Sequence, residues 1–355
     1  MRILVTGTSG NVGTALLRRL VPAGHQVVGL ARRVPSPIGP YAGVSWAAVD
    51  LTSANAADRL ADLARGSDAM VHLAWGFQPT HDPAYLQRLD LGGTAAVIDA
   101  ALDAGVPHVV HLSSVGAYSA RTREVPVTES WPVGGIPSLP YSQHKAAAES
   151  LLDDVERRHG SAVTVARVRP SLIGQRAAAS ALWRYTVPSL LPGAAVKLLR
   201  VLPLDRSLAV QLLHADDVAD AVVRILDRRA QGAYNLASDE VLRVPEIAAA
   251  LGARPVHVPY RALRAAASVT WQARLQPVSP GWLDLAYSAP LLDSGRARSE
   301  LGWMPTRSAP SVLAEVLDGM RHSAGTASQV LRPSRWTDSL SRLVRQGPVA
   351  ERHVS

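Results

Sequence analysis

The chain has 355 residues and a formal net charge of +8, with 47% hydrophobic residues, 19% charged residues and no cysteine. This composition is typical of a globular protein with a large core, and no apolar run is long enough to span a bilayer. The arginines are scattered and are not interleaved with aromatic residues, which disfavours nucleic-acid binding. The lack of cysteine excludes disulfides and thiolate metal ligands, and we expect no metal site. Because Met1-Arg2 leads straight into an apolar run with no room for a secretory signal, we expect a cytoplasmic protein.

Short β-like runs alternate with helical stretches over the first half of the chain. The β-like runs are Ile3 to Val5, Gln26 to Leu30, Val44 to Val49, Ala69 to Leu73, His108 to Leu112 and Val163 to Val168. The main helical stretches are 93–104 and 141–158. This alternation predicts an α/β fold, a doubly wound parallel sheet of the Rossmann type, with a smaller C-terminal substrate-binding lobe.

The expected organisation has three parts. Residues 1–174 form the dinucleotide-binding core, and 175–322 form a mixed region that contributes a last core element and the substrate lobe. Residues 323–355 are rich in Ser, Arg and Gln, and we expect a flexible tail.

A glycine-rich turn follows the first apolar run and precedes the helical stretch Ala15 to Leu20. It consists of Gly7, Thr8, Ser9, Gly10, Asn11, Val12 and Gly13. Glycines at a strand-to-helix turn allow positive φ angles and let backbone N–H groups approach the phosphates of a dinucleotide. We therefore expect these seven residues to bind the pyrophosphate of a cofactor.

The end of the second strand indicates which cofactor binds. An NAD site favours an acidic residue here, whereas this chain has Ala31 followed by Arg32 and Arg33. An arginine can bind a 2′-phosphate bidentately, so the sequence predicts a preference for NADP(H), with NAD(H) still possible. Asp50 and Leu51, after the third strand, are the expected contacts to the adenine, although Asp50 could equally cap the following helix.

Tyr141 and Lys145 lie four residues apart on one face of a predicted helix. A lysine and a positive nicotinamide near a tyrosine would lower the pKa of the phenol toward neutrality, which suits acid/base chemistry. Ser113 and Ser114 end the strand that should lie beside this helix, where a hydroxyl could hold a substrate oxygen.

These motifs together resemble the extended short-chain dehydrogenases/reductases, often called the NAD-dependent epimerase/dehydratase family. The resemblance covers residues 1 to about 320 and includes His72-Leu73-Ala74, Arg169 to Gly174, His214 to Ala219 and Leu301 to Pro305. It implies that Ser114, Tyr141 and Lys145 are catalytic, with Lys145 also on the nicotinamide ribose. The cofactor contacts that it further implies are Leu73, Ala74, Trp75, Ser113, Pro170 and Ile173. Trp75 and Gln78 could also line the substrate side.

The chain also departs from the family pattern. Val115-Gly116 replaces the Asp-Glu pair of the sugar dehydratases, and Gln211 occupies a region where related epimerases place an arginine on the diphosphate. Asp90 stands where an asparagine is usual. The apolar stretches 181–183, 187–191 and 198–204 suit a hydrophobic small-molecule substrate, although they could equally pack a lid on its own core. Arg184, Arg200 and Arg206 could still bind a phosphate.

Three functions therefore remain open. The first is reduction of a carbonyl or oxidation of an alcohol, with hydride transfer to or from NADP(H) and Tyr141 as acid or base. The alternative is a sugar or nucleotide-sugar epimerase that retains NAD(P), and the third is a non-catalytic NADP-binding protein. The resemblance also implies an option to form a homodimer through the helices at 93–104 and 141–158.

Overall fold

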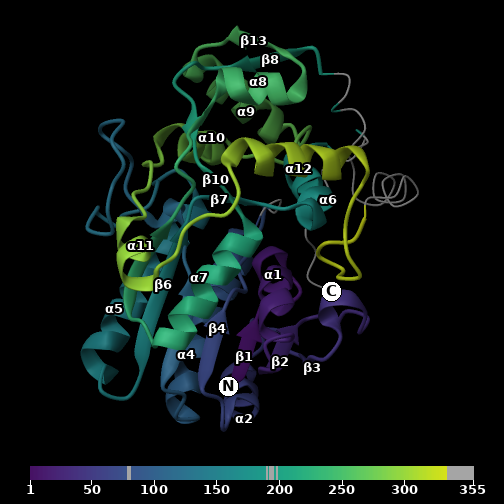
Figure 1. Cartoon of the computed structure of the whole chain (residues 1–355). Helices are drawn as coiled ribbons and strands as arrows, with labels where there is room; N and C mark the ends of the chain where they lie inside the picture. The colour runs from purple at the N-terminus through teal and green to yellow at the C-terminus, as the bar shows by residue number, and fades with distance from the viewer. Residues whose placement is uncertain (78–80, 189–190, 192–195, 197–198, 334–355) are drawn as a thin grey trace.

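One parallel sheet of seven strands forms the centre of the molecule (Figure 1). The computed structural model describes residues 1–77, 81–188, 191, 196 and 199–333. The strands, in their order across the sheet, are β11 (Gly232–Leu236), β6 (Thr164–Pro170), β5 (His108–Leu112), β4 (Ala69–His72), β1 (Arg2–Thr6), β2 (Gln26–Ala31) and β3 (Ser45–Ala48). The six expected strands are confirmed. The seventh, β11, is the core element that the region after residue 174 adds.

Helices cover both faces of the sheet because successive strand residues point to opposite sides. Ile3 and Val5 of β1 lie in a core cluster with the buried faces of α1 (Asn11–Leu20) and α7 (Ala215–Arg228). Leu4 points the other way, into a cluster shared with α2 (Ala56–Ala64), α4 (Gly93–Asp103) and α5 (Pro140–His159). The doubly wound architecture predicted from the sequence is therefore confirmed.

A smaller lobe lies at the end of the sheet opposite the N-terminus (Figure 1). Its helices are α6 (Ala179–Thr186), α8 (Val244–Leu251), α9 (Tyr260–Gln272), α10 (Pro280–Ser288) and α12 (Ala309–Arg321). Three two-stranded sheets accompany them: β7 (Leu172–Gly174) with β10 (Leu212–His214), β9 (Ala209–Val210) with β12 (Leu242–Arg243), and β8 (Val201–Leu204) with β13 (Arg254–His257). The remaining described α-helices are the short α3 (Pro83–Gln87) and α11 (Gly295–Leu301), and a π-helical turn, η2 (Arg88–Gly92), directly follows α3.

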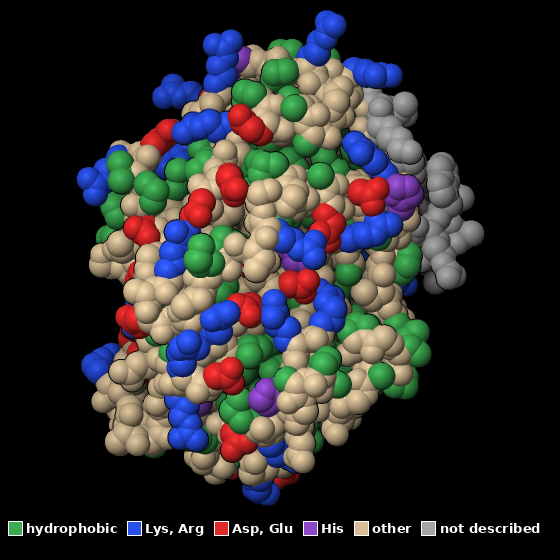
Figure 2. Space-filling view, in the orientation of Figure 1, with side chains coloured by type: hydrophobic (Ala, Val, Ile, Leu, Met, Phe, Trp, Pro, Cys, Tyr) green, Lys and Arg blue, Asp and Glu red, His purple; other side chains and the backbone are tan. Residues whose placement is uncertain are grey.

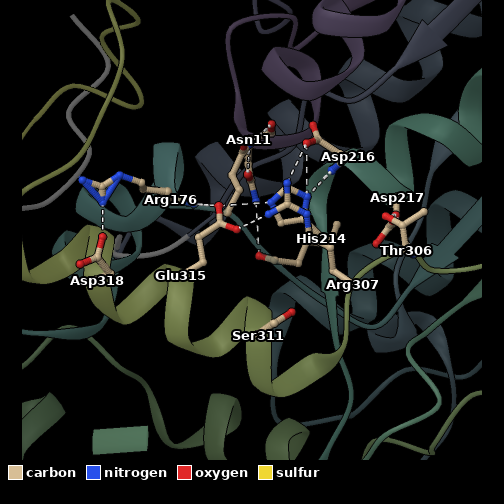
Figure 3. A network of polar contacts seen from close by, with 12 residues as sticks. Asn11, Arg176, His214, Asp216, Asp217, Thr306, Arg307, Ser311, Glu315 and Asp318 are labelled. Atoms are coloured by element: carbon tan, nitrogen blue, oxygen red, sulfur yellow. Dashed lines mark hydrogen bonds and ion pairs between the residues drawn. The ribbon is translucent and has the colours of Figure 1, made fainter.

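The two later motifs, His214 to Ala219 and Leu301 to Pro305, connect the lobe to the core. Trp303 is fully buried and its indole N–H donates to the carbonyl of Asp217 at 2.8 Å, while the Asp217 carboxylate accepts from the Thr306 backbone N–H at 3.0 Å. Figure 3 shows His214 between Asp216 and Glu315, so that α12 is held beside the start of α7. Both motifs therefore hold the fold together at the carboxyl end of the sheet.

The C-terminal segment differs from the expected flexible tail beginning at residue 323. Residues 323–333 are placed against the core: the Ser328 hydroxyl donates to the carbonyl of Ser9 at 2.7 Å, and Leu331 is buried. Thr326 shares a hydrogen bond of 2.7 Å with the hydroxyl of Tyr41. Apolar burial and these polar contacts explain why the segment docks. The rest of the expected tail, 334–355, and Gln78 lie outside the described residues.

Surface charge, helix hydropathy and the grouping of His, Asp and Glu side chains bear on what the described residues can bind. On the face shown in Figure 2, basic side chains are interspersed with acidic ones. No helix within the described ranges is both long and apolar enough to cross a bilayer. The same residues contain no group of three or more His, Asp or Glu side chains placed to hold a metal ion.

Candidate active site

The glycine turn connects β1 to α1 and packs against the residues that follow β4. Gly7 has a φ of 66°, and a Cβ on it would lie 2.6 Å from the backbone nitrogen of Ala74. A Cβ on Gly13 would lie 2.4 Å from the carbonyl oxygen of Thr8. Only glycine fits at both positions, and the N-terminus of α1 is thereby brought to the carboxyl end of the sheet. A cradle of this shape fits the pyrophosphate of a dinucleotide.

Side chains of the turn hold it in place. The Thr8 hydroxyl is buried, donates to the carbonyl of Val5 at 2.5 Å and accepts from the backbone N–H of Leu30 at 3.0 Å. The Asn11 side chain accepts from Gln175 at 2.7 Å and donates to the carbonyl of Ile173 at 3.4 Å. Hydrogen bonds therefore connect the turn to β2 on one side and to β7 and the following Gln175 on the other.

The residues expected at the adenosine end lie together beyond β2 and β3. Arg32 and Arg33 are exposed, and Arg32 Nη1 donates to the hydroxyl of Tyr85 at 2.7 Å. The Asp50 carboxylate accepts from the backbone N–H of Thr52 at 2.9 Å, which is a turn-capping role. Leu51 is buried in the core beside α4. The structure thus places both arginines directly after β2, at the carboxyl end of the sheet.

Tyr141 lies in the first turn of α5, which the loop after β5 positions. The Ser142 hydroxyl donates to the carbonyl of Gly116 and accepts from the backbone N–H of Ile136 at 2.6 Å, which fixes the start of the helix. The Ser114 hydroxyl accepts from the Gly116 N–H at 3.0 Å. A Cβ on Gly116 would lie 3.3 Å from Ser114 Oγ and 3.1 Å from the Tyr141 ring, so the two side chains lie on the same side of this residue.

Lys145 lies one helical turn further along α5 and is buried. Its ammonium donates to the carbonyl of Leu112 at 2.6 Å and lies 3.3 Å from the centre of the Trp75 ring. Burial lowers the pKa of Lys145 to about 7, against the opposing effects of Asp90 and Glu149. Burial raises the pKa of Tyr141 to about 12, although the hydrogen bond with Ser114 lowers it. The protein alone thus shifts the tyrosine pKa upward, opposite to the direction that we expected from the lysine.

Two buried histidines lie beneath this site. Burial, and then the charge of Lys145, lower the pKa of His72 to about 3, and the same two causes hold the pKa of His111 well below its usual value. His72 is paired with Thr6 at 2.7 Å and Thr94 at 3.1 Å. Both rings are therefore neutral in the folded protein at physiological pH.

These histidines predict how stability depends on pH. A folded-state pKa below the unfolded value of 6.5 means that the unfolded chain binds more protons, so the free energy of unfolding falls as pH drops from 6.5 toward 3. Each buried histidine should contribute a slope of about 1.4 kcal/mol per pH unit in that range. Urea unfolding at several pH values should show that the free energy of unfolding of His72→Gln changes less steeply with pH, by about that amount. An unchanged slope would show that His72 titrates normally in the folded chain.

Asp90 holds the loop that carries Trp75. It is fully buried in the π-helical turn η2, where one carboxylate oxygen accepts from the backbone N–H of Gly76 at 2.6 Å and the other contacts His144 Nδ1 at 2.9 Å. A neutral asparagine could not supply two acceptor oxygens, so the departure at Asp90 is matched by its partner His144. His144, on α5 between Tyr141 and Lys145, was not singled out by the sequence analysis.

The hydroxyl of Ser113 points away from the cofactor side. It donates to Glu149 at 2.5 Å. Arg169 binds the same buried carboxylate through both oxygens, at 2.8 and 2.7 Å, and Arg167 lies 3.3 Å from it. Burial alone would raise the pKa of Glu149, but the hydrogen bond and charge of Arg169 outweigh it and lower this pKa. The cluster joins α5 to β6 below the catalytic residues, so the side chain of Ser113 has a structural role and only its backbone remains a candidate cofactor contact.

An aromatic cluster surrounds the ring of Tyr141. The ring centre of Trp282 lies 5.0 Å from that of Tyr141, Phe77 lies 6.0 Å away and Trp75 lies 6.4 Å away. Tyr185 of α6 extends the cluster, 5.4 Å from Phe77. Sequence reasoning missed Phe77, Tyr185 and Trp282. The only signal was that Phe77 is the single phenylalanine of the chain and that Trp282 lies in a Trp-containing part of the lobe.

Pro170 is the last residue of β6, and Ile173 lies in β7, at the same end of the sheet. The structure thus brings together the glycine turn, the segment Leu73 to Trp75, the candidate residues Ser114, Tyr141 and Lys145, and this loop along the carboxyl ends of β1, β4, β5 and β6. Open α/β sheets bind ligands at that edge. A family model described as NAD-dependent epimerase/dehydratase matches residues 3–237.

The chain belongs to the NAD-dependent epimerase/dehydratase family. It is 27% identical over 341 residues to a UDP-glucose 4-epimerase of Mycolicibacterium smegmatis, covering 91% of this chain and 100% of the relative. It is also 27% identical over 353 residues to the 4-hydroxy-2-methyl-3-oxo-4-farnesyl-3,4-dihydroquinoline-1-oxide ketoreductase of Stigmatella aurantiaca, covering 94% and 100%.

Two further comparisons bear on length and fold. An uncharacterized protein of Mycobacterium tuberculosis is 29% identical over 328 residues, but this chain spans only 31% of its length. The solved UDP-glucose 4-epimerase of Thermus thermophilus, in complex with NAD, matches with a TM-score of 0.68 at 21% identity, covering 91% of this chain and 100% of that chain. The latter likeness confirms the fold predicted for the family.

Proposed function

We propose that the protein reduces a carbonyl compound with NADPH, or oxidises the matching alcohol with NADP⁺. The observation that carries this proposal is that Ser114 Oγ and the Tyr141 ring both lie against Gly116, beside a wall of aromatic rings. An apolar wall suits a hydrophobic ketone better than a sugar diphosphate, whose hydroxyls and charges need polar partners. Family membership and the full-length match to a ketoreductase support it.

In this proposal Tyr141, Ser114 and Lys145 each have a separate role in the reaction. A bound nicotinamide cofactor supplies or accepts the hydride. Tyr141 is protonated at physiological pH because burial raises its pKa to about 12, so it can donate a proton to the substrate oxygen. Ser114 is placed to donate a hydrogen bond to the same oxygen as negative charge develops on it. Lys145 would hold the ribose hydroxyls of the cofactor, and a cation there eases loss of the tyrosine proton.

The NADP(H) preference rests on the two exposed arginines after β2. Arg33→Ala should raise the KM for NADPH about tenfold and leave the KM for NADH nearly unchanged, because a charged hydrogen bond to phosphate is lost. Arg65→Ala is the matched control, since Arg65 is exposed at the end of α2 and pairs with Asp62 at 2.8 Å. Steady-state kinetics with NADPH and with NADH measures the two KM values for each variant. A lower KM for NADH than for NADPH in the unaltered protein would contradict the proposed preference.

The second candidate function is a nucleotide-sugar epimerase, which the full-length match to the mycobacterial UDP-glucose 4-epimerase favours. The side chains in the region of the expected diphosphate argue against it. Gln211 donates to the carbonyls of Ser238 at 2.9 Å and Leu292 at 3.2 Å and accepts from the Leu292 N–H at 2.7 Å, so its side chain is fully engaged. Arg184 donates to the carbonyls of Arg332 and Val330. An assay of NADPH oxidation with carbonyl substrates, run beside an assay of UDP-sugar interconversion, separates the two functions.

A further inference from the structure

The aromatic cluster around Tyr141 contains two buried polar groups that no protein atom satisfies. Among the described residues, the indole N–H groups of Trp75 and Trp282 are buried and lack a hydrogen-bond partner. An unpaired buried donor costs about 1–3 kcal/mol, and a ligand that accepts from it recovers that cost. The ring centre of Trp282 lies 5.0 Å from that of Tyr141, the proposed proton donor, and that of Trp75 lies 6.4 Å from it, so Trp282 is the nearer of the two rings.

The position of Trp282 is fixed by backbone packing. A Cβ on the preceding residue, Gly281, would lie 2.4 Å from the carbonyl oxygen of Ser138, so α10 packs directly on the chain that leads into α5. The Ser138 hydroxyl donates to Asp284, and Arg264 Nε contacts the same carboxylate at 2.8 Å. Trp282 is therefore held against the first turn of α5 by the packing of α10 on the segment that precedes α5.

The neighbouring rings define the shape of what can bind. The ring centre of Phe77 lies 4.7 Å from that of Trp282, and those of Tyr185 and Tyr141 lie 5.4 and 6.0 Å from Phe77. Each of these rings remains partly exposed, so the cluster has accessible faces beside Tyr141. Aromatic rings gain about 0.5–1.5 kcal/mol from offset or edge contacts with another ring, beyond the area that they bury.

We infer that the substrate is a planar aromatic ketone with a second hydrogen-bond acceptor next to the reacting carbonyl. The ring of the substrate would lie against Phe77 and Trp282, its carbonyl oxygen would accept from Tyr141, and its second oxygen would accept from Trp282 Nε1. This inference rests on the proposed reductase function and narrows it to a substrate class. It makes Trp282 a specificity-determining residue supplied by the lobe.

A matched pair of ketones tests the inference. Acenaphthenequinone is a planar aromatic 1,2-diketone, and acenaphthenone is the same ring system with one carbonyl. Reduction transfers a hydride from NADPH to the carbonyl carbon and a proton from Tyr141 to its oxygen, giving the hydroxyketone or the alcohol. Trp282→Phe keeps an aromatic ring and removes the N–H. We expect this variant to lower kcat/KM for the diketone about threefold to tenfold, as loss of one hydrogen bond does, and to change that for the monoketone less than twofold.

Binding without turnover provides a second readout. In the Tyr141→Phe background with NADPH present, calorimetric titration should show the same selective loss of affinity for acenaphthenequinone when Trp282→Phe is added. An equal loss for both ketones, or no loss for either, would overturn the role of the N–H. Cyclohexane-1,2-dione, which has the two oxygens without the aromatic ring, separates the two levels of the proposal. If it is reduced as well as the aromatic diketone, the substrate class is wrong while the reductase function stands. If no ketone oxidises NADPH, both are wrong.

Discussion

Tyr141→Phe should lower kcat for carbonyl reduction by about 10²- to 10⁴-fold, because it removes the hydroxyl that we propose transfers the proton and keeps the ring. The phenyl ring can still pack against Trp75, Phe77 and Trp282, so the fold should persist. The dissociation constant for NADPH should change little, since the phenol has no expected contact with the adenosine half of the cofactor. Stopped-flow hydride transfer and fluorescence titration of NADPH measure these two quantities separately.

Tyr118→Phe is the matched control for that experiment. The hydroxyl of Tyr118 is also buried beside the site, and burial raises its pKa to about 12. It donates to Asn235 at 2.7 Å and accepts from Arg169 at 2.8 Å, so its role is structural. This variant should lose about 1–3 kcal/mol of stability and retain most of its kcat. A near-normal kcat in Tyr141→Phe, or an equal loss in both variants, would remove Tyr141 from its assigned role.

Glu149→Ala should destabilise the protein by about 3–5 kcal/mol, because it leaves the buried guanidinium of Arg169 without its carboxylate partner. The variant also leaves the Ser113 hydroxyl without its acceptor. Urea unfolding followed by circular dichroism gives the free energy of unfolding. Because Glu149 also opposes the lowering of the Lys145 pKa, we expect activity to fall with the folded population and its pH profile to shift.

Glu156→Ala is the control for the buried pair. Glu156 lies on the same helix and contacts the same partner, Arg167, at 2.6 Å, but its side chain is 33% exposed. A partly exposed ion pair contributes at most about 1 kcal/mol, so this variant should remain close to the unaltered protein. If Glu149→Ala also lost less than about 1 kcal/mol, the buried cluster would not be what joins α5 to β6.

The elements that could be predicted from the sequence are those with local signals. The strands Ile3 to Val5 and His108 to Leu112 are apolar runs bounded by turns, and the glycine turn has a spacing that only a strand-to-helix connection explains. The Tyr141 and Lys145 pair follows from helical periodicity alone. These features needed no knowledge of distant contacts, and the structure confirms the sheet that they predict.

The rest of the site depends on contacts between distant parts of the chain. Trp282 reaches Tyr141 only because Gly281 lets α10 approach Ser138, and no local pattern indicates that approach. Asp90 was recognised as a departure, but its partner His144 depends on how η2 packs beside α5. The sequence predicts a lowered pKa of Tyr141 from a lysine and a positive nicotinamide together, whereas in the protein alone burial raises this pKa.

We propose that this site consumes NADPH in reducing an aromatic ketone. Nicotinamide absorbance and product formation can be followed together, with acenaphthenequinone in one reaction and UDP-glucose in another. We expect one NADPH to be oxidised per hydroxyketone formed and UDP-glucose to remain unconverted. Conversion of UDP-glucose to its 4-epimer without net consumption of cofactor, together with no reduction of the ketone, would contradict it.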